Sequence, residues 1–171
     1  MNNGLKSKDS IMLIESLQKH SPRLIELNLS KNKMGIKGAC YLAEALKSMK
    51  LLTQLDLAEN EIGDFGITEI AKVLNNYGVL EYLDISGNNI GKTNQILECA
   101  EALGTYLATN PHLEHFKISW NNLRGVAGEK IIEGLIHSSG IKTVCMNNNL
   151  LGIAYDGKQS PVCKISELFL H

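Results

Sequence analysis

The sequence predicts an α/β solenoid in which parallel strands line the concave face of a horseshoe and helices cover its convex face. Two observations support this prediction. A block of the form L-x-x-L-x-L-x-x-N-x-L occurs five times at intervals of 28 or 33 residues, and each of the first four blocks is followed by apolar residues at helical spacing. The composition allows one folded core, because 44% of the 171 residues are hydrophobic and 20% are charged.

Each block is expected to form a strand. In the first block, Leu27 and Leu29 have the period of two that places both leucines on one face of a strand and Asn28 on the other. The same alternation recurs in every block, so one face of the sheet is aliphatic and belongs to the core. The residues expected at this position of the open face are Asn28, Asp56, Asp84, Lys117, Cys145 and Phe169.

The second half of each of these repeats is expected to form a helix. Leu42 and Leu46 lie four residues apart, which places both on the helix face that packs against the strands. Small residues at Ala43, Ala71 and Gly104 are expected to let helix and strand approach each other. The axes of packed helices lie about 8–10 Å apart whereas neighbouring parallel strands lie about 4.8 Å apart. The array must therefore bend with its strands on the inside. The other pairs at this spacing are Ile70 and Leu74, Leu103 and Leu107, and Ile131 and Leu135.

These blocks resemble the leucine-rich repeat superfamily along nearly the whole chain. The long period, with helix-like halves such as residues 38–46 and 66–74, is similar to the ribonuclease-inhibitor-like class. The resemblance implies that the block asparagines form a ladder of hydrogen bonds to backbone groups where each strand ends. An amide suits this position because it both donates and accepts. The asparagines are Asn32, Asn60, Asn88, Asn121 and Asn149.

Residues 1–171 are expected to form a single repeat array of about five repeats, with a partial repeat at each end. Residues 3–5 resemble the end of a strand block and residues 11–17 its helix, and a sixth block begins at Ile165. Terminal repeats of a solenoid normally carry polar caps, and none is visible here. We therefore expect the chain to be a segment of a longer protein, or to be covered at both ends by neighbours.

Two repeats depart from the pattern. The third carries five extra residues around 92–97, which form either a loop at a binding rim or one more helical turn through Ile96 and Leu97. In the fifth repeat, residues 153–161 contain glycine and proline without four-residue aliphatic spacing, so no full helix is expected there.

Enzymatic and metal chemistry are not expected. The sequence contains no phosphate-binding loop, no dinucleotide-binding glycine motif and no G-x-S-x-G or H-E-x-x-H pattern. His112 and His115 have no cysteine or carboxylate completing a zinc set, and Asp56 with Asp84 is expected to be a solvated pair rather than a cation site. No catalytic residue, metal or cofactor is therefore predicted.

Charge and hydropathy also limit the classes of partner. The net charge of −1 gives no overall attraction to nucleic acid or anionic lipid. The longest purely apolar runs, such as residues 11–14, are far shorter than the roughly 20 residues that span a bilayer. We expect a cytoplasmic protein, in a cytoskeletal or ciliary setting as one option, with neither nucleic acid nor membrane as partner.

The open strand face is the candidate binding surface. Its first repeats are acidic and its later ones aromatic and weakly basic, and the only tryptophan stands at a strand exit outside the aliphatic pattern. Tryptophan is a preferred interface anchor. The alternative is a tryptophan that packs over its neighbours without a partner. The predicted contact centre for a protein partner consists of Tyr82, His115, Lys117 and Trp120, with Asp56, Glu59 and Asp84 setting orientation by charge.

The leading interpretation is therefore a non-catalytic protein-interaction scaffold that works within a larger complex. A second interpretation is a regulator of a small GTPase, because Ran GTPase-activating proteins have similar repeats and Arg124 stands where other repeats have Gly35, Gly63, Gly91 and Gly152. A third is the sensor segment of a nucleotide-binding receptor, or a structural subunit of a cytoskeletal or ciliary assembly.

Overall fold

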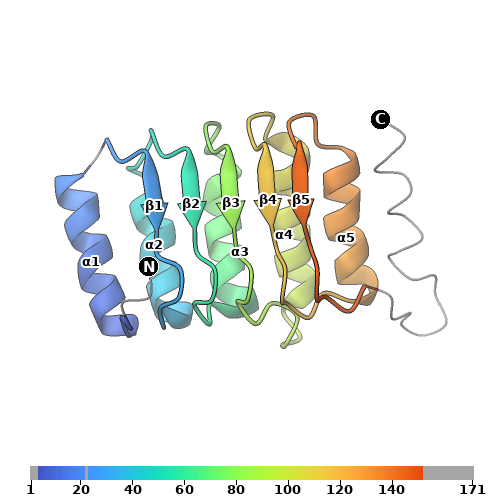
Figure 1. Cartoon of the computed structure of the whole chain (residues 1–171), viewed down its shortest axis with the longest axis horizontal. Coiled ribbons are helices and arrows are strands. Elements are labelled where there is room, and N and C mark those ends of the chain that lie inside the picture. The colour runs from blue at the N-terminus through green and yellow to red at the C-terminus, as the bar shows by residue number, and fades with distance from the viewer. Residues whose placement is uncertain (1–3, 22, 152–171) are drawn as a thin grey trace.

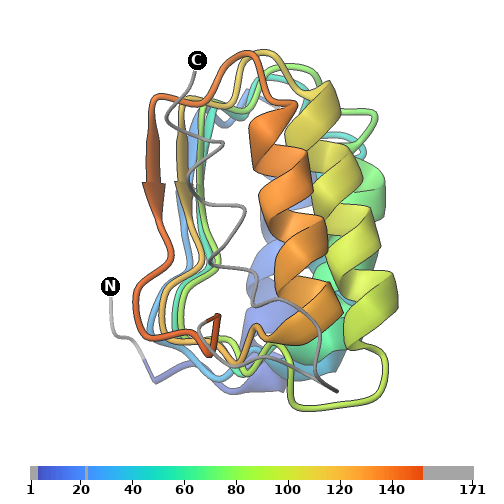
Figure 2. The same cartoon turned by 90° about the vertical axis from the view of Figure 1, so that its right-hand side faces the viewer.

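Strands and helices alternate along the chain in the computed structural model, which describes residues 4–21 and 23–151 (Figure 1). The strands form one layer and the helices a second layer on one side of it (Figure 2). The elements are α1 (Ser7–His20), β1 (Glu26–Asn28), α2 (Gly35–Leu46), β2 (Gln54–Asp56), α3 (Gly63–Leu74), β3 (Tyr82–Asp84), α4 (Ile96–Thr109), β4 (His115–Lys117), α5 (Gly125–Ile136) and β5 (Thr143–Cys145).

The described strands form a single parallel sheet in chain order, β1-β2-β3-β4-β5. Equivalent block positions pair across the sheet, so that Leu27 lies opposite Leu55, and Leu55 opposite Leu83. A crossover helix follows each of the first four strands, as parallel strands require. The predicted fold class, an α/β solenoid of strand–helix repeats, is confirmed.

The core lies between the two layers. Leu55, Leu83 and Phe116 project from the strands and are fully buried, and Leu42 and Leu103 project from the helices to meet them. Full burial of one such side chain contributes about 1.5–3 kcal/mol. The alternation of buried and exposed residues along each strand therefore fixes which face remains open.

The asparagine ladder forms as the repeat pattern predicts. Asn88 Oδ1 accepts from the backbone N–H groups of Asn60 and Ile62 at 3.0 and 3.3 Å, and Asn88 Nδ2 donates to Leu57 O at 2.8 Å. Asn121 repeats this arrangement one repeat later, at 3.0 Å to the N–H of Asn88. Each amide thus satisfies backbone groups of the preceding repeat where no strand or helix supplies partners.

The extra residues of repeat three form a loop rather than a helical turn. Leu103 is the eighth residue of α4, as Leu42 is of α2, so α4 begins at the usual place and the insertion precedes it. The carboxylate of Asp64, which is 1% exposed, holds this loop: Oδ1 accepts from Gly91 N at 2.6 Å, and Oδ2 accepts from Thr93 N at 2.9 Å and from Thr93 Oγ1 at 2.6 Å.

Gly104 allows a close approach between α4 and α5 rather than the predicted approach between helix and strand. It was expected to bring α4 close to the strands, but a Cβ at this position would lie 2.7 Å from the carbonyl oxygen of Lys130 on α5. A Cβ on Gly134 would in turn strike the carbonyl of Gly104. The two glycines therefore let the backbones of neighbouring helices touch.

Some expectations fall outside the described residues. These are the sixth block from Ile165 with Phe169, the irregular segment 153–161, and residue 3 of the N-terminal partial repeat. Among the helices that the structure describes, none is long and apolar enough to cross a membrane.

Candidate functional site

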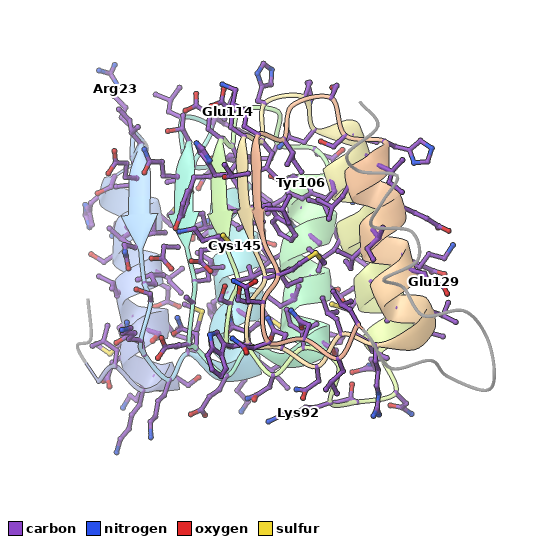
Figure 3. The ribbon with its side chains drawn as sticks, turned by 45° about the vertical axis from the view of Figure 1, so that its right-hand side comes forward. Arg23, Lys92, Tyr106, Glu114, Glu129 and Cys145 are labelled. Atoms are coloured by element: carbon purple, nitrogen blue, oxygen red, sulfur yellow. The ribbon has the colours of Figure 1, made fainter. Side chains whose placement is uncertain are left out.

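The open face of the sheet presents two rows of side chains, because successive residues of each short strand point to opposite faces. None of the described helices covers this face (Figure 2), and Figure 3 shows side chains projecting from it. The first row consists of Glu26, Gln54, Tyr82, His115 and Thr143, and the second of Asn28, Asp56, Asp84, Lys117 and Cys145.

Tyr82 is at the centre of an aromatic and cationic cluster on β3 and β4. Its ring lies 6.4 Å from the His115 ring, centroid to centroid, at an interplanar angle of 53°. The Lys117 ammonium lies 5.0 Å from the centroid of the Tyr82 ring, a cation–π distance. Hydrogen bonding to Tyr82 is the main cause that raises the pKa of Lys117 above its ordinary value. Three of the predicted contact residues therefore form one connected group.

The acidic residues lie beside this cluster, and local bonds fix their orientation. Asp56 and Asp84 are register partners on β2 and β3. The Oδ1 atom of each accepts a backbone N–H two residues further on, from Ala58 at 3.0 Å and from Ser86 at 2.9 Å. Asp56 Oδ2 accepts from Asn28 Nδ2 at 2.9 Å. Among residues 4–21 and 23–151, no group of three His, Cys, Asp or Glu side chains could hold a metal ion.

Glu59 and Trp120 lie at the strand exits rather than on the strands. Glu59 forms an exposed ion pair with Lys31 at 3.8 Å, of the kind worth about 0–1 kcal/mol. Trp120 is 70% exposed, so neighbouring described residues cover only a small part of the indole. The corresponding residue of the preceding repeat is Gly87, which has no side chain to cover the indole.

The strand-exit position has a left-handed backbone in every described repeat. The φ angle of Trp120 is +57°, a conformation that is costly for a bulky residue. With this backbone conformation the Trp120 side chain lies largely in solvent and outside the core. The other members of this row are Lys31 (φ +59°), Glu59 (+56°), Gly87 (+65°) and Asn148 (+57°).

Two polar partners of the cluster were not predicted. Thr143 Oγ1 lies 2.6 Å from His115 Nδ1 and holds the imidazole, and Glu114 Oε1 lies 2.6 Å from Lys142 Nζ at the strand-entry rim. Hydrogen bonding to Lys142 lowers the pKa of Glu114. The repeat register could have identified Thr143, since it occupies the block position of His115.

Arg124 does not occupy the backbone position that the sequence alignment gave it. Its φ of −152° is extended. Gly35 and Gly63 begin their helices with a positive φ, and in repeat four the residue with that conformation is Gly125, at +51°. The alignment itself holds, because Arg124 follows Asn121 by three residues as Gly35 follows Asn32, but α5 begins one residue later than the alignment predicts. Arg124 lies at the start of α5 and not on the open strand face.

Comparisons with known proteins agree with this architecture. A family model described as leucine-rich repeat matches residues 48–71, 79–93 and 109–131. Among 43 matching chains of solved structures is "Leiomodin-1 Actin-Binding Site 2 (ABS2)", with a TM-score of 0.65 and 19% sequence identity over 94% of this chain and 86% of that one. At this identity the likeness concerns the fold alone. No curated protein matches the chain significantly by sequence. The matched repeats, the parallel sheet and the asparagine ladder together show the leucine-rich repeat fold in the described residues.

Proposed function

We propose that this protein is a non-catalytic scaffold that binds a protein partner through the concave strand face and the strand-exit rim. The exposure of Trp120 carries the proposal, because this large amphipathic side chain stands in water at the exit of β4, the strand that provides His115 and Lys117 of the cluster. Aromatic side chains of this kind supply most of the energy at protein interfaces, typically at their centre. The remaining contacts then provide shape and orientation.

Acidic and basic side chains lie at different parts of the proposed surface. Asp56, Asp84 and Glu59 lie toward the β2 side and Lys117 toward the β4 side, so a partner is expected to place a basic patch against the first group and an acidic or aromatic one against Lys117. Such complementarity steers encounter and fixes register more than it adds affinity.

A binding role rather than a catalytic one is supported by the chemistry of the described residues. Burial raises the pKa of the Cys99 thiol to about 12 and also raises that of Cys40, which is the opposite of an activated nucleophile. Leucine-rich repeats generally serve as non-catalytic interaction modules.

Actin is the first partner to test. The neighbouring solved structure is named as an actin-binding site of leiomodin-1, which gives a reason to examine a cytoplasmic, cytoskeletal role within a larger complex. Our proposal includes neither nucleic acid nor membrane as partner.

The experiment uses a photo-crosslinking amino acid at position 120 and, as a matched control, at position 41. Tyr41 is an aromatic residue of α2, 47% exposed on the helix layer. With purified monomeric or filamentous actin, we expect adducts from position 120 only, and a loss of affinity of about tenfold in Trp120→Ala with unchanged melting. If the protein does not bind actin, the proposed cytoskeletal role is wrong. If the same crosslinking in cells gives equally abundant adducts from positions 120 and 41, the concave face is not the binding site.

A further inference from the structure

A groove lies at the strand-exit rim where α4 and α5 begin, away from the open strand face. Its volume is about 250 Å³, and Ile96, Leu97, Val126 and Ala127 give it apolar walls. Asn94 and Arg124 also line it. Leu97 is 49% exposed, so a large aliphatic surface faces water here without a partner in the described chain. One lining residue, Asn94, belongs to the insertion of repeat three that precedes α4.

The walls of the groove are fixed before any ligand arrives. Asp64 anchors the inserted loop through its three hydrogen bonds to Gly91 and Thr93. Gly91 fits closely against the backbone of Asn122, where a Cβ would collide with the carbonyl oxygen. A preformed site of this kind loses little entropy on binding.

Arg124 is the one charged residue among the described residues that line the groove. Arg124 is exposed and forms no ion pair within residues 4–21 and 23–151, and the ammonium of Lys92 on the inserted loop donates to Asn89 Oδ1 at 2.7 Å. Glu98, the acidic residue of the first turn of α4, already pairs with Lys72 at 2.9 Å. The first turn of α5 contains no acidic residue, so the partial positive charge of that helix end is not offset.

We propose that this groove is a second docking site, specific for a linear segment of a partner protein in which a carboxylate adjoins an aliphatic side chain. The aliphatic group packs between Leu97 and Val126, and the carboxylate accepts a bidentate pair of hydrogen bonds from the Arg124 guanidinium. Apolar walls beside an unpaired guanidinium favour this occupant over a basic segment, which the same charges repel. The site is independent of the concave face and of the function proposed for it.

The test is selection of a phage library of random short peptides against the full chain. We expect enriched sequences to place Asp or Glu within one or two residues of Leu, Ile or Met, with a dissociation constant of about 10–100 µM for the synthetic peptide. Arg124→Glu is expected to weaken that peptide by about tenfold or more, and Leu97→Ala by about fivefold. The matched control is Arg23→Glu, the same substitution at the opposite rim, where Arg23 lies far from Lys92 (Figure 3); it is expected to leave affinity within about twofold.

Three outcomes would overturn the proposal: no enrichment, enrichment of basic or uncharged sequences, or an acidic peptide whose affinity neither Arg124→Glu nor Leu97→Ala changes. Trp120→Ala separates this site from the concave face. A peptide that loses affinity in Trp120→Ala but not in the groove variants binds the concave face, which refutes the groove while supporting the function proposed above. Circular dichroism confirms that each variant is folded.

Discussion

The Lys117 ammonium lies 5.0 Å from the centroid of the Tyr82 ring, which belongs to the neighbouring strand. The contact joins β3 to β4 on the open face and holds a flexible cation in one place. A lysine ordered in this way loses less side-chain entropy when a partner arrives than a freely rotating one does. The pair therefore links the two strands and is an ordered part of the proposed binding surface.

Removing the Tyr82 hydroxyl should lower the pKa of Lys117. Hydrogen bonding to Tyr82 is the main cause of the raised value, so in Tyr82→Phe the pKa is expected to return toward its ordinary 10.5. A folded-state pKa above the unfolded value stabilises the fold below pH 10.5, and this contribution is lost as the pH rises through the folded pKa. An NMR titration of the Lys117 side chain gives the measurement. An unchanged pKa would contradict the hydrogen bond to the Tyr82 hydroxyl.

Truncating a ladder asparagine should destabilise the fold strongly. In Asn88→Ala, the buried N–H groups of Asn60 and Ile62 lose their acceptor and Leu57 O loses a donor. We expect a loss of about 2–5 kcal/mol in the free energy of unfolding, measured by denaturant titration. Asn75→Ala, at the exposed end of α3, is the matched control and should cost no more than about 0.5 kcal/mol. Equal effects of the two substitutions would show that the ladder does not stabilise the array.

Adding a methyl group between α4 and α5 should also destabilise the protein. Ala normally favours a helix over Gly by about 1 kcal/mol, but in Gly104→Ala the new Cβ meets the backbone oxygen of Lys130. We expect a net loss of about 1–3 kcal/mol, because a backbone atom cannot rotate away. Gly78→Ala, where nothing lies within 4 Å, should be neutral or slightly stabilising in the same thermal denaturation series. A Gly104→Ala variant as stable as Gly78→Ala would rule out the close helix contact.

Periodicity alone was sufficient to predict the strands, the helices and the core, and the resemblance to leucine-rich repeats supplied the ladder. The alternation around Leu55 and the four-residue spacing of Leu42 and Leu46 are local, and burial follows from them directly. The placement of Tyr82, His115 and Lys117 on one face followed from the same register.

Contacts that depend on the path of the chain could not be predicted. Asp64 holds a loop 27 to 29 residues away, and nothing in the block pattern indicates that the insertion folds back onto it. Arg124 takes the sequence position of Gly35 in its repeat, yet the helix begins one residue later because repeat four has a longer turn after its ladder asparagine. The left-handed backbone of Trp120 likewise emerges only from the geometry of the turn.

The row of left-handed strand exits is a part of the array in which residue type can vary during evolution. Its members already include a cation, an anion, a glycine, an aromatic residue and an amide, and none of these five positions belongs to the aliphatic core pattern. A substitution in this row can therefore change an exposed side chain while leaving the buried aliphatic pattern of the neighbouring repeats unchanged. The exits can vary without cost to the core, within the limits set by their left-handed backbone and by pairs such as Lys31 and Glu59 that join adjacent repeats.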